Sequence, residues 1–556
     1  MRKITVTIEN PTGTTESFEV EAGTTLHDIL REKTFNGLPV LAALVNNDVI
    51  SLFQPVNVTS TIRPLTLDDE HGWRVYRWSL CFLLAKAAHE ATPDLEVRVR
   101  HAFGTGLFCT IEGKHPFDRN AAIEALSKKL REYVESDIKI ERTVLGYQEA
   151  LDTFEALHED DKLFLLRHRN PPTVAVADCE GYIGLLQEPM VDHAGLLQVF
   201  TLSPYEDGFV LRLPFKNAPH SLAPLKGPKH LSMIFKEHIR WGEILGVTTA
   251  SELNQIVMKN EIDEFIRVAE ALHDKRLADI ASQIAQRSPR VRLVLLAGPS
   301  SSGKTTTAKR ITTHLRVLGL RPFMISTDNY FLGDKDTPRD ANGKLDYEHI
   351  HAMNLELLND NIIGLLKGEE VEMPRFDFRN HRPFPYRTKA HLDPGQVIIM
   401  EGIHCLNPEL TAKIPREYKF LIYVSALTQL AVDRCCRVST TDNRLLRRLV
   451  RDNQFRSRPA VESLRLWPSV RRGESRWIFP YQDLADATFN SALDYEIGVL
   501  KPYAHALLNT VKPSMPEYAE ARRLTAMLQN FMIIPQDAVP GDSILRECIG
   551  GSQLSY

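Results

Sequence analysis

Residues 298–305 read Gly-Pro-Ser-Ser-Ser-Gly-Lys-Thr, which matches the phosphate-binding pattern GxxxxGK[ST]. The preceding residues 291–297 form an apolar run of strand length, and residues 306–318 have the apolar spacing of a helix. This order predicts a strand, a loop and a helix whose N-terminal N–H groups cradle the phosphates of a nucleoside triphosphate. Lys304 is expected to reach the β- and γ-phosphates, and Thr305 to ligate Mg²⁺. The predicted nucleotide site comprises Gly298, Pro299, Ser300, Ser301, Ser302, Gly303, Lys304, Thr305 and Thr306.

The composition indicates a large globular protein rather than a membrane or nucleic-acid-binding chain. Its 556 residues suffice for roughly three or four domains, and the net charge of −4 gives no general attraction to polyanions. No apolar run is as long as a membrane span, and the N-terminus alternates like a strand rather than a signal peptide. The seven cysteines are dispersed, which predicts reduced thiols and a cytoplasmic location.

The pattern of apolar residues divides the chain into four parts and predicts a multi-domain α/β protein. Residues 1–62 are expected to form a small β-grasp domain, with a helix capped by Thr24 or Thr25. Residues 63–225 are expected to form an α+β domain, and residues 226–288 a helical connector. Residues 289–556 alternate strand and helix patterns, which predicts a parallel sheet around the phosphate-binding loop.

Two acidic residues follow apolar strands of this last part. Asp328 follows the run 323–326, and Glu401 follows the run 397–400. Carboxyl ends of parallel strands border the nucleotide crevice, so both side chains are expected near the phosphates. Asp328 is a candidate general base or Mg²⁺ ligand, although an Asp that caps a helix would look the same. Glu401 suits Mg²⁺ coordination, directly or through water.

Arginine is concentrated in residues 434–476, where acidic residues offset it only partly. A solvated helix face and an RNA-binding strip are both compatible with such a run, but aromatic residues are sparse before Trp467. Beside a phosphate-binding loop, we interpret the stretch as a lid that closes over the triphosphate. Separately, the loop 373–383 contains Phe376 and His381, which could stack on and hydrogen-bond a base, or could be purely structural.

Together these motifs resemble the uridine kinase and phosphoribulokinase group of kinases. The resemblance runs in order through ISTDNYF (325–331), FDFRNHR (376–382), IIMEGIH (398–404) and TDNRLLRRLVRDNQFRSR (441–458). It implies an ATP- and Mg²⁺-dependent nucleoside kinase that phosphorylates the 5′-hydroxyl of uridine or cytidine. The implied roles are catalysis by Lys304, Asp328, Arg451 and Arg456, metal binding by Thr305, Glu401 and Asp328, and nucleoside binding by Glu348, Phe376, His381, Arg448 and Arg458.

Some positions depart from the pattern of that group. Phe376 replaces a Tyr, Glu348 replaces an Asp, and Ser457 replaces a Gly between the two lid arginines. These positions would touch the nucleoside, so another small hydroxyl acceptor, such as a sugar phosphate, stays open as an alternative.

The N-terminal half resembles the front of threonyl-tRNA synthetases, with a ubiquitin-like TGS domain and an editing-type domain. The likeness lies in LAALVNNDVISL (41–52) and in residues 72–87. At the positions of the editing ligands the chain has Trp78, Phe82, Leu186 and Met190, none of which is a base or a hard-metal ligand. We therefore expect no deacylase activity, and we regard His193 as structural.

The full order of parts, and the ending SILRECIGGS (543–552), resemble a bacterial family of fused nucleoside kinases. We expect a nucleoside substrate, a homo-oligomer and no membrane partner. A nucleotide-switched protein that binds RNA or ribosomes through its N-terminal half remains the non-catalytic alternative.

Overall fold

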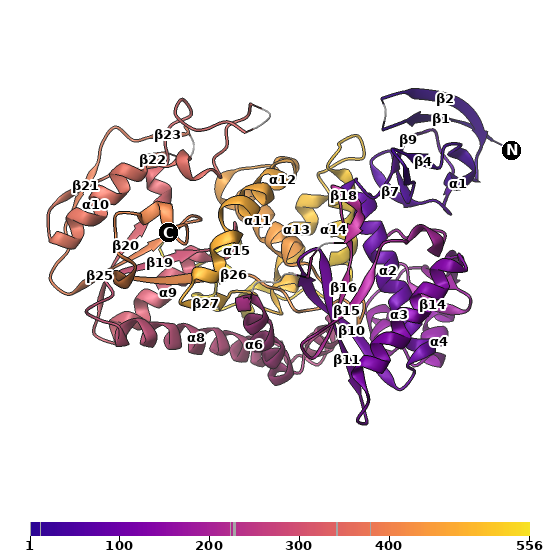
Figure 1. Ribbon diagram of the computed structural model, residues 1–556, viewed down its shortest axis with the longest axis horizontal. Coiled ribbons are helices and arrows are strands. Elements are labelled where there is room, and N and C mark those ends of the chain that lie inside the picture. Colours follow the sequence, from indigo (N-terminus) through magenta and orange to yellow (C-terminus); the bar gives the residue numbers. More distant parts are fainter. Residues whose placement is uncertain are drawn as a thin grey trace.

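The computed structural model describes residues 2–11, 13–222, 224–225, 229–340, 343–377 and 380–555, with residues 229–233 described by their backbone alone. Residues 226–228, at the predicted start of the connector, and residues 378–379 of the predicted base-binding loop lie outside the described residues. Figure 1 shows the N-terminal half and the kinase-like part, residues 289–556, side by side. Helices α13 (Glu496–Leu508) and α14 (Tyr518–Leu528) lie between them. Among the described residues, no helix combines the length and apolarity that crossing a membrane requires.

The first part is a mixed sheet with strand order β2-β1-β9-β6-β7. Its parallel pair is formed by β1 and β9, and the other neighbours are antiparallel. As predicted, Thr25 caps the short helix, and its side chain accepts a hydrogen bond from the Asp28 N–H. The elements are β1 Lys3–Glu9, β2 Thr15–Glu21, β3 Thr24–Thr25, α1 Leu26–Ile29, β4 Thr34–Phe35, β5 Leu38–Pro39, β6 Ala42–Val45, β7 Asp48–Ser51, β8 Pro55–Val56 and β9 Ser60–Leu65.

The second part packs helices against two antiparallel sheets, β10-β11-β16-β15 and β12-β13-β14. The buried helix expected near residues 79–89 is longer than predicted, because Asp69 caps it two turns earlier. The elements are α2 Glu70–Ala91, β10 Leu95–Phe103, β11 Gly106–Gly113, α3 Arg119–Glu135, β12 Glu141–Gly146, α4 Tyr147–Ala156, α5 Asp160–Arg167, β13 Thr173–Cys179, β14 Tyr182–Leu185, β15 Thr201–Tyr205, β16 Gly208–Arg212, β17 Pro214–Phe215 and β18 Ala218–Leu222.

The predicted connector consists of helices α6 Lys229–Leu245, α7 Ala250–Met258 and α8 Ile262–Gln286. These helices are more than a linker, because they are docked on the kinase-like part. His238 of α6 makes a buried contact of 3.2 Å with Asp494, and His273 of α8 contacts the Ala492 carbonyl oxygen at 3.1 Å. Helix α8 also packs along the helix that follows the phosphate-binding loop.

The third part is built on a sheet of order β20-β25-β19-β26-β27, in which every neighbouring pair is parallel. Both faces are buried, one under α9 and α8 and the other under α10, so the predicted parallel α/β architecture of this part is confirmed. The strands and helices are β19 Leu293–Ala297, α9 Lys304–Val317, β20 Arg321–Ser326, α10 Leu355–Lys367, β21 Val371–Met373, β22 Phe376–Asp377, β23 Arg382–Pro383, β24 Thr388–Ala390, β25 Gln396–Glu401, β26 Lys419–Ser425, α11 Thr440–Arg456, α12 Ala460–Trp477, β27 Ala487–Asn490, α13 Glu496–Leu508, α14 Tyr518–Leu528 and α15 Arg546–Ile549.

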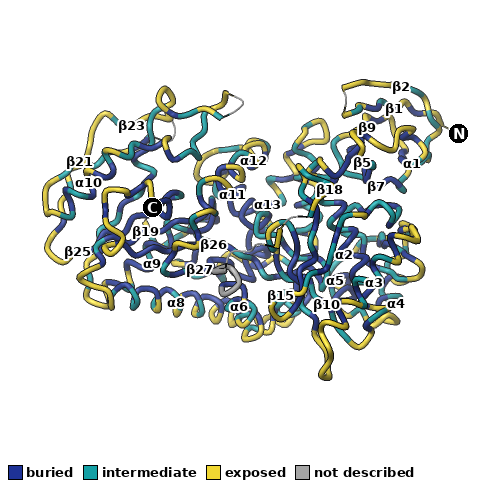
Figure 2. The backbone as a smooth tube through the Cα atoms, viewed as in Figure 1, coloured by how far each residue is buried: buried dark blue, intermediate teal, exposed yellow. Residues whose placement is uncertain are grey.

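The N-terminal half and the last helices share one hydrophobic core. Buried residues of α4, α5 and β13 belong to the same cluster as those of α11, α12, α13 and α14. Figure 2 shows the buried stretches of backbone that run through this junction. The two halves are therefore joined by apolar packing as well as by the chain.

Candidate nucleotide and phosphoryl-transfer site

The phosphate-binding loop follows β19 and ends where α9 begins. Gly298 has no room for a side chain, because a Cβ there would lie 2.1 Å from the Val424 carbonyl oxygen. Gly303 has a φ of 79°, a conformation that suits glycine, and directly precedes the first residue of α9. Lys304 Nζ donates to the Pro299 carbonyl oxygen at 3.2 Å, which places the ammonium group over its own loop. The N–H groups at the start of α9 and this ammonium are suited to an anionic ligand.

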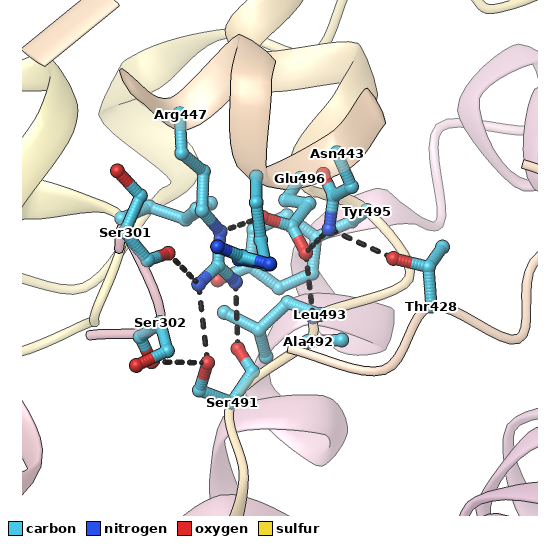
Figure 3. Close-up of polar contacts among 12 residues, drawn as sticks. Ser301, Ser302, Thr428, Asn443, Arg447, Ser491, Ala492, Leu493, Tyr495 and Glu496 are labelled. Atoms are coloured by element: carbon cyan, nitrogen blue, oxygen red, sulfur yellow. Dashed lines mark hydrogen bonds and ion pairs between the residues drawn. The ribbon is translucent and has the colours of Figure 1, made fainter. Parts of the chain in front are cut away.

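A buried arginine supports the phosphate-binding loop from the protein interior. Figure 3 shows Arg447 of α11 among Ser301, Ser491 and Glu496. Arg447 forms an ion pair with Glu496, and its guanidinium donates to the Ser491 carbonyl oxygen at 2.7 Å and to the Ser301 carbonyl oxygen at 3.4 Å. Ser491 in turn donates to the Ser302 carbonyl oxygen at 2.6 Å. The shape of the loop thus depends on a charge pair that is almost fully removed from water.

A second charge pair binds the phosphate-binding loop at Ser300. Arg444 Nε donates to the Ser300 carbonyl oxygen at 2.9 Å, and Glu474 of α12 accepts the Ser300 N–H at 2.9 Å. Arg444 and Glu474 also pair with each other. For Arg444 and Arg447 the predicted role in a lid over the triphosphate is wrong, because both guanidiniums are buried and bind protein carbonyls. Glu474 and Glu496 were not predicted as partners, since nothing local in the sequence distinguishes a buried acid from a solvated one.

Asp328 and Glu401 come together at the carboxyl edge of the sheet, as predicted. Ser326 of β20 is in register with Glu401 of β25, and its hydroxyl donates to the Glu401 carboxylate at 2.9 Å. Burial, and next the Asp328 carboxylate, raise the pKa of Glu401 to about 7. Burial also raises the pKa of Asp328, although Lys304 lies close enough to oppose this shift. A cation beside these acids would relieve both effects.

The residues present fit a triphosphate with a hard cation. Two loop hydroxyls, of Ser301 and Ser302, are buried without a hydrogen-bond partner among the described residues, as is the nearby Thr327 hydroxyl. Thr305 lies in the first turn of α9, directly after Lys304, and is only half-buried. Oxygen donors of this kind are the ligands that Mg²⁺ prefers.

The predicted acceptor-side residues Glu348, Phe376 and His381 lie on two segments that follow β20 and α10. Glu348 packs against α12, where a Cβ on Gly473 would lie 2.3 Å from the Glu348 Cβ. Burial, and next the Glu474 carboxylate, raise the pKa of Glu348 to about 7. Phe376 is buried with its ring 5.8 Å from Phe331. His381 is exposed, and its ring lies 5.5 Å from Tyr347.

The four arginines predicted to belong to the site, two for the substrate and two for the lid, converge on one buried acid, Asp452. Its carboxylate contacts the guanidiniums of Arg448, Arg451, Arg456 and Arg458 at 3.3, 2.8, 3.6 and 3.4 Å. Burial alone would raise the pKa of Asp452, but the surrounding arginines together lower it. Arg448 also donates to the Ser300 hydroxyl at 2.8 Å, which connects this cluster to the phosphate-binding loop.

The C-terminal tail, for which the sequence offered no physical role, packs on the phosphate-binding loop. Ile544 fills the space beside Gly303, where a Cβ would lie 2.7 Å from Ile544 Cγ2. Thr306 of α9 donates to the Glu547 carboxylate at 2.9 Å, and Lys309 reaches the Ser555 carbonyl oxygen. The nucleotide site therefore includes the last residues of the chain as well as the loop itself.

We expect Ile544→Ala to destabilise the protein by about 2–5 kcal/mol, because the side chain is 1% exposed and its removal leaves a cavity in the core. The loosened loop should also raise the KM for ATP. Ile533→Ala is the matched control, since Ile533 is 55% exposed. Equal thermal unfolding midpoints for the two variants would contradict the packing role of the tail.

In the N-terminal half, the predicted replacements of the editing ligands are mostly core residues. Phe82 and Met190 are buried, and Trp78 and Leu186 pack against the same cluster. His193, which we regarded as structural, lies near Asp192 and His27, with one donor atom of each within 4.8 Å of the others. His27 and Asp192 are hydrogen-bonded at 2.8 Å, which joins α1 to the second part.

The two halves of the chain are similar to different known proteins. The phosphoribulokinase/uridine kinase family matches residues 293–497. A uridine kinase of Staphylococcus aureus strain JH9 is 30% identical over 198 residues, covering 35% of this chain and 84% of that enzyme. A uridine kinase of Halobacterium salinarum is 32% identical over 163 residues, covering 29% of this chain and, at 63%, less than two thirds of the relative. A threonine–tRNA ligase of Acetivibrio thermocellus is 27% identical over 163 residues, covering 29% of this chain and 26% of the ligase. Such ligase matches indicate a related N-terminal part.

Proposed function

This chain belongs, through its C-terminal part, to the phosphoribulokinase/uridine kinase family, and on that premise we propose that it transfers the γ-phosphoryl group of ATP to a nucleoside 5′-hydroxyl. Uridine and cytidine are the proposed acceptors, and the products are the nucleoside monophosphate and ADP. The observation that carries the proposal is the convergence of Lys304, Asp328 and Glu401 beside a phosphate-binding loop. The family matches support phosphotransferase chemistry of this class.

In this proposal, separate residues bind the phosphates, hold the metal and accept the proton. The N–H groups of the loop and Lys304 bind the phosphates of ATP and neutralise charge on the transferring group. Thr305 and Glu401, with Asp328 beside them, would hold Mg²⁺, which supplies a divalent charge against the phosphate oxygens. Asp328 accepts the proton of the acceptor hydroxyl, and burial makes it a stronger base than an exposed Asp. Arg451 and Arg456 place further positive charge on the same side, since both lower the pKa of Asp328.

Acceptor binding is assigned to a separate set of residues. Glu348 would hold the ribose hydroxyls, and Phe376 and His381 would border the base. Arg448 and Arg458 are held by Asp452 and would reach the nucleoside or the phosphates. Phe376 and Glu348 depart from the uridine kinase pattern. If the acceptor proves to be a sugar phosphate, these are the positions to mutate first.

The proposal is tested by following ADP release with a panel of ribonucleosides and phosphorylated sugars. We expect turnover with pyrimidine nucleosides. Turnover with sugar phosphates alone would replace the nucleoside by the alternative acceptor class, and no turnover from protein that binds ATP would refute both.

The pH dependence of nucleoside binding should depend on Glu348. Its pKa is raised to about 7, so the group is a neutral acid below that pH and a carboxylate above it. A carboxylate accepts stronger hydrogen bonds from ribose hydroxyls than an acid does, so the nucleoside KM should fall by about tenfold as pH rises through 7.

The matched variants are Glu348→Gln and Glu356→Gln, of which the second changes an exposed acid on α10. Glu348→Gln should make the nucleoside KM high and independent of pH, whereas Glu356→Gln should retain the wild-type profile. A wild-type pH profile of KM in Glu348→Gln would remove this residue from acceptor binding.

A further inference from the structure

A cavity lies between the N-terminal half and α14, and its lining contains no residue of the phosphate-binding loop. Its volume is about 430 Å³, within the range of small-molecule sites. The lining comes from three parts of the chain: β7, the α2 and β13–β14 region, and α14. Figure 1 shows α14 lying between the two halves, where β7 and α2 face it. The cavity is therefore formed only when all three parts are packed together.

The cavity is rich in arginine. Arg142, Arg169 and Arg522 line it, and its lining acids are Asp48 and Glu188. Within the described residues, neither Arg142 nor Arg169 has a carboxylate close enough for an ion pair, and Arg169 has only a long hydrogen bond of 3.4 Å to Asn530. Arg522 is 3.8 Å from Asp48, which is longer than a hydrogen bond. The three guanidiniums that line the cavity thus retain N–H donors that no carboxylate of the described residues accepts.

Two further arginines of the lining are fixed by acids behind the wall. Arg523 pairs with Glu520 and, through two contacts of 2.6 and 2.9 Å, with Asp442. Arg74 pairs with Glu520 as well. These pairs leave Arg523 and Arg74 largely neutralised, so the attraction for an anion rests on Arg142, Arg169 and Arg522.

Another part of the lining is an apolar wall, and one polar group of the cavity lacks a partner. Leu166, Val174 and Leu185 form this wall. The Gln187 amide nitrogen, which also lines the cavity, is buried without a hydrogen-bond acceptor among the described residues. An unsatisfied buried amide costs free energy, and a bound ligand with an acceptor oxygen would relieve it.

We propose that this cavity binds a phosphorylated small molecule of nucleotide size. Its phosphate contacts Arg142, Arg169 and Arg522, and its organic body lies on the apolar wall with an oxygen near Gln187. Because Asp442 lies in the first turn of α11, the bound molecule would sit one residue, Arg523, away from the helix that holds the phosphate-binding loop.

The site is tested by equilibrium dialysis with AMP, UMP, ribose 5-phosphate and inorganic phosphate on the full-length protein. Lys304→Ala removes the main phosphate contact of the other site, and of the binding that survives this change, the part that the arginine variants below weaken is assigned to the cavity. At least one phosphate ester should bind saturably to Lys304→Ala protein. Adding Arg169→Gln or Arg522→Gln should weaken that binding about tenfold or more, since a hydrogen bond between charged groups is lost.

Arg167→Gln is the matched control, because Arg167 lies on the same segment as Arg169 but is exposed and outside the lining. If Arg169→Gln does not fold, Arg142→Gln replaces it. Arg142 also lines the cavity but is an exposed residue, so its replacement removes little buried packing. Binding that these changes leave unaltered, or no binding that survives Lys304→Ala, overturns the proposal. Equal affinity for inorganic phosphate and the esters overturns it too, because the apolar wall would then contribute nothing.

Discussion

Replacing Asp328 with Asn should lower kcat about 100-fold or more while ATP binding is retained. Asn keeps the shape of the side chain but cannot accept the proton of the acceptor hydroxyl, and general bases contribute about 10²–10⁴ in rate. Burial raises the pKa of Asp328, which makes it a stronger base than an exposed Asp. The measurement is steady-state kinetics with uridine, together with the dissociation constant for ATP.

Asp336→Asn is the control for this change. Asp336 lies on the same segment but is exposed, and we expect wild-type kcat from the variant. An unchanged kcat in Asp328→Asn would remove Asp328 as the base. A parallel loss of ATP binding would instead assign its main role to the metal-bound nucleotide.

The second large effect is expected from Arg447→Met, which should destabilise the protein by about 3–5 kcal/mol. Arg447 is one of the largest side chains that are fully buried, and its removal leaves the Glu496 carboxylate without its cation. The Ser301 and Ser491 carbonyl oxygens also lose their donor. Denaturant unfolding measures the loss, and the KM for ATP should rise because the loop is no longer held.

Two further variants separate the charge effect from general damage. Arg447→Met combined with Glu496→Leu should recover part of the lost stability, because no unpaired charge is then buried. Arg472→Ala, an exposed arginine of α12, should change stability by less than about 0.5 kcal/mol. A loss for Arg447→Met no larger than that for Arg472→Ala would contradict the role of the buried pair.

The local structure around the loop was predictable because its signals are short-range. The strand before Gly298, the helix after Gly303 and the strands before Asp328 and Glu401 follow from apolar periodicity and glycine alone. The parallel edge then brings the acids together by topology. The same reasoning predicted the cap at Thr25.

The supports of the site were not predictable, because they depend on contacts distant in sequence. Asp452 and Glu474 look like ordinary members of a charged stretch, yet each is buried among arginines. The contact between Thr306 and Glu547 joins residues 241 positions apart. An arginine-rich run predicts positive charge but not whether a given guanidinium faces solvent, phosphate or a buried acid.

The most direct test of the account is transfer of label from γ-³²P-ATP to uridine, with 5′-deoxyuridine in a parallel reaction. We expect labelled uridine 5′-monophosphate from uridine and no labelled product from 5′-deoxyuridine, which lacks the acceptor hydroxyl. Labelling of 5′-deoxyuridine, or no labelled nucleotide from uridine or cytidine with protein that binds ATP, would contradict it.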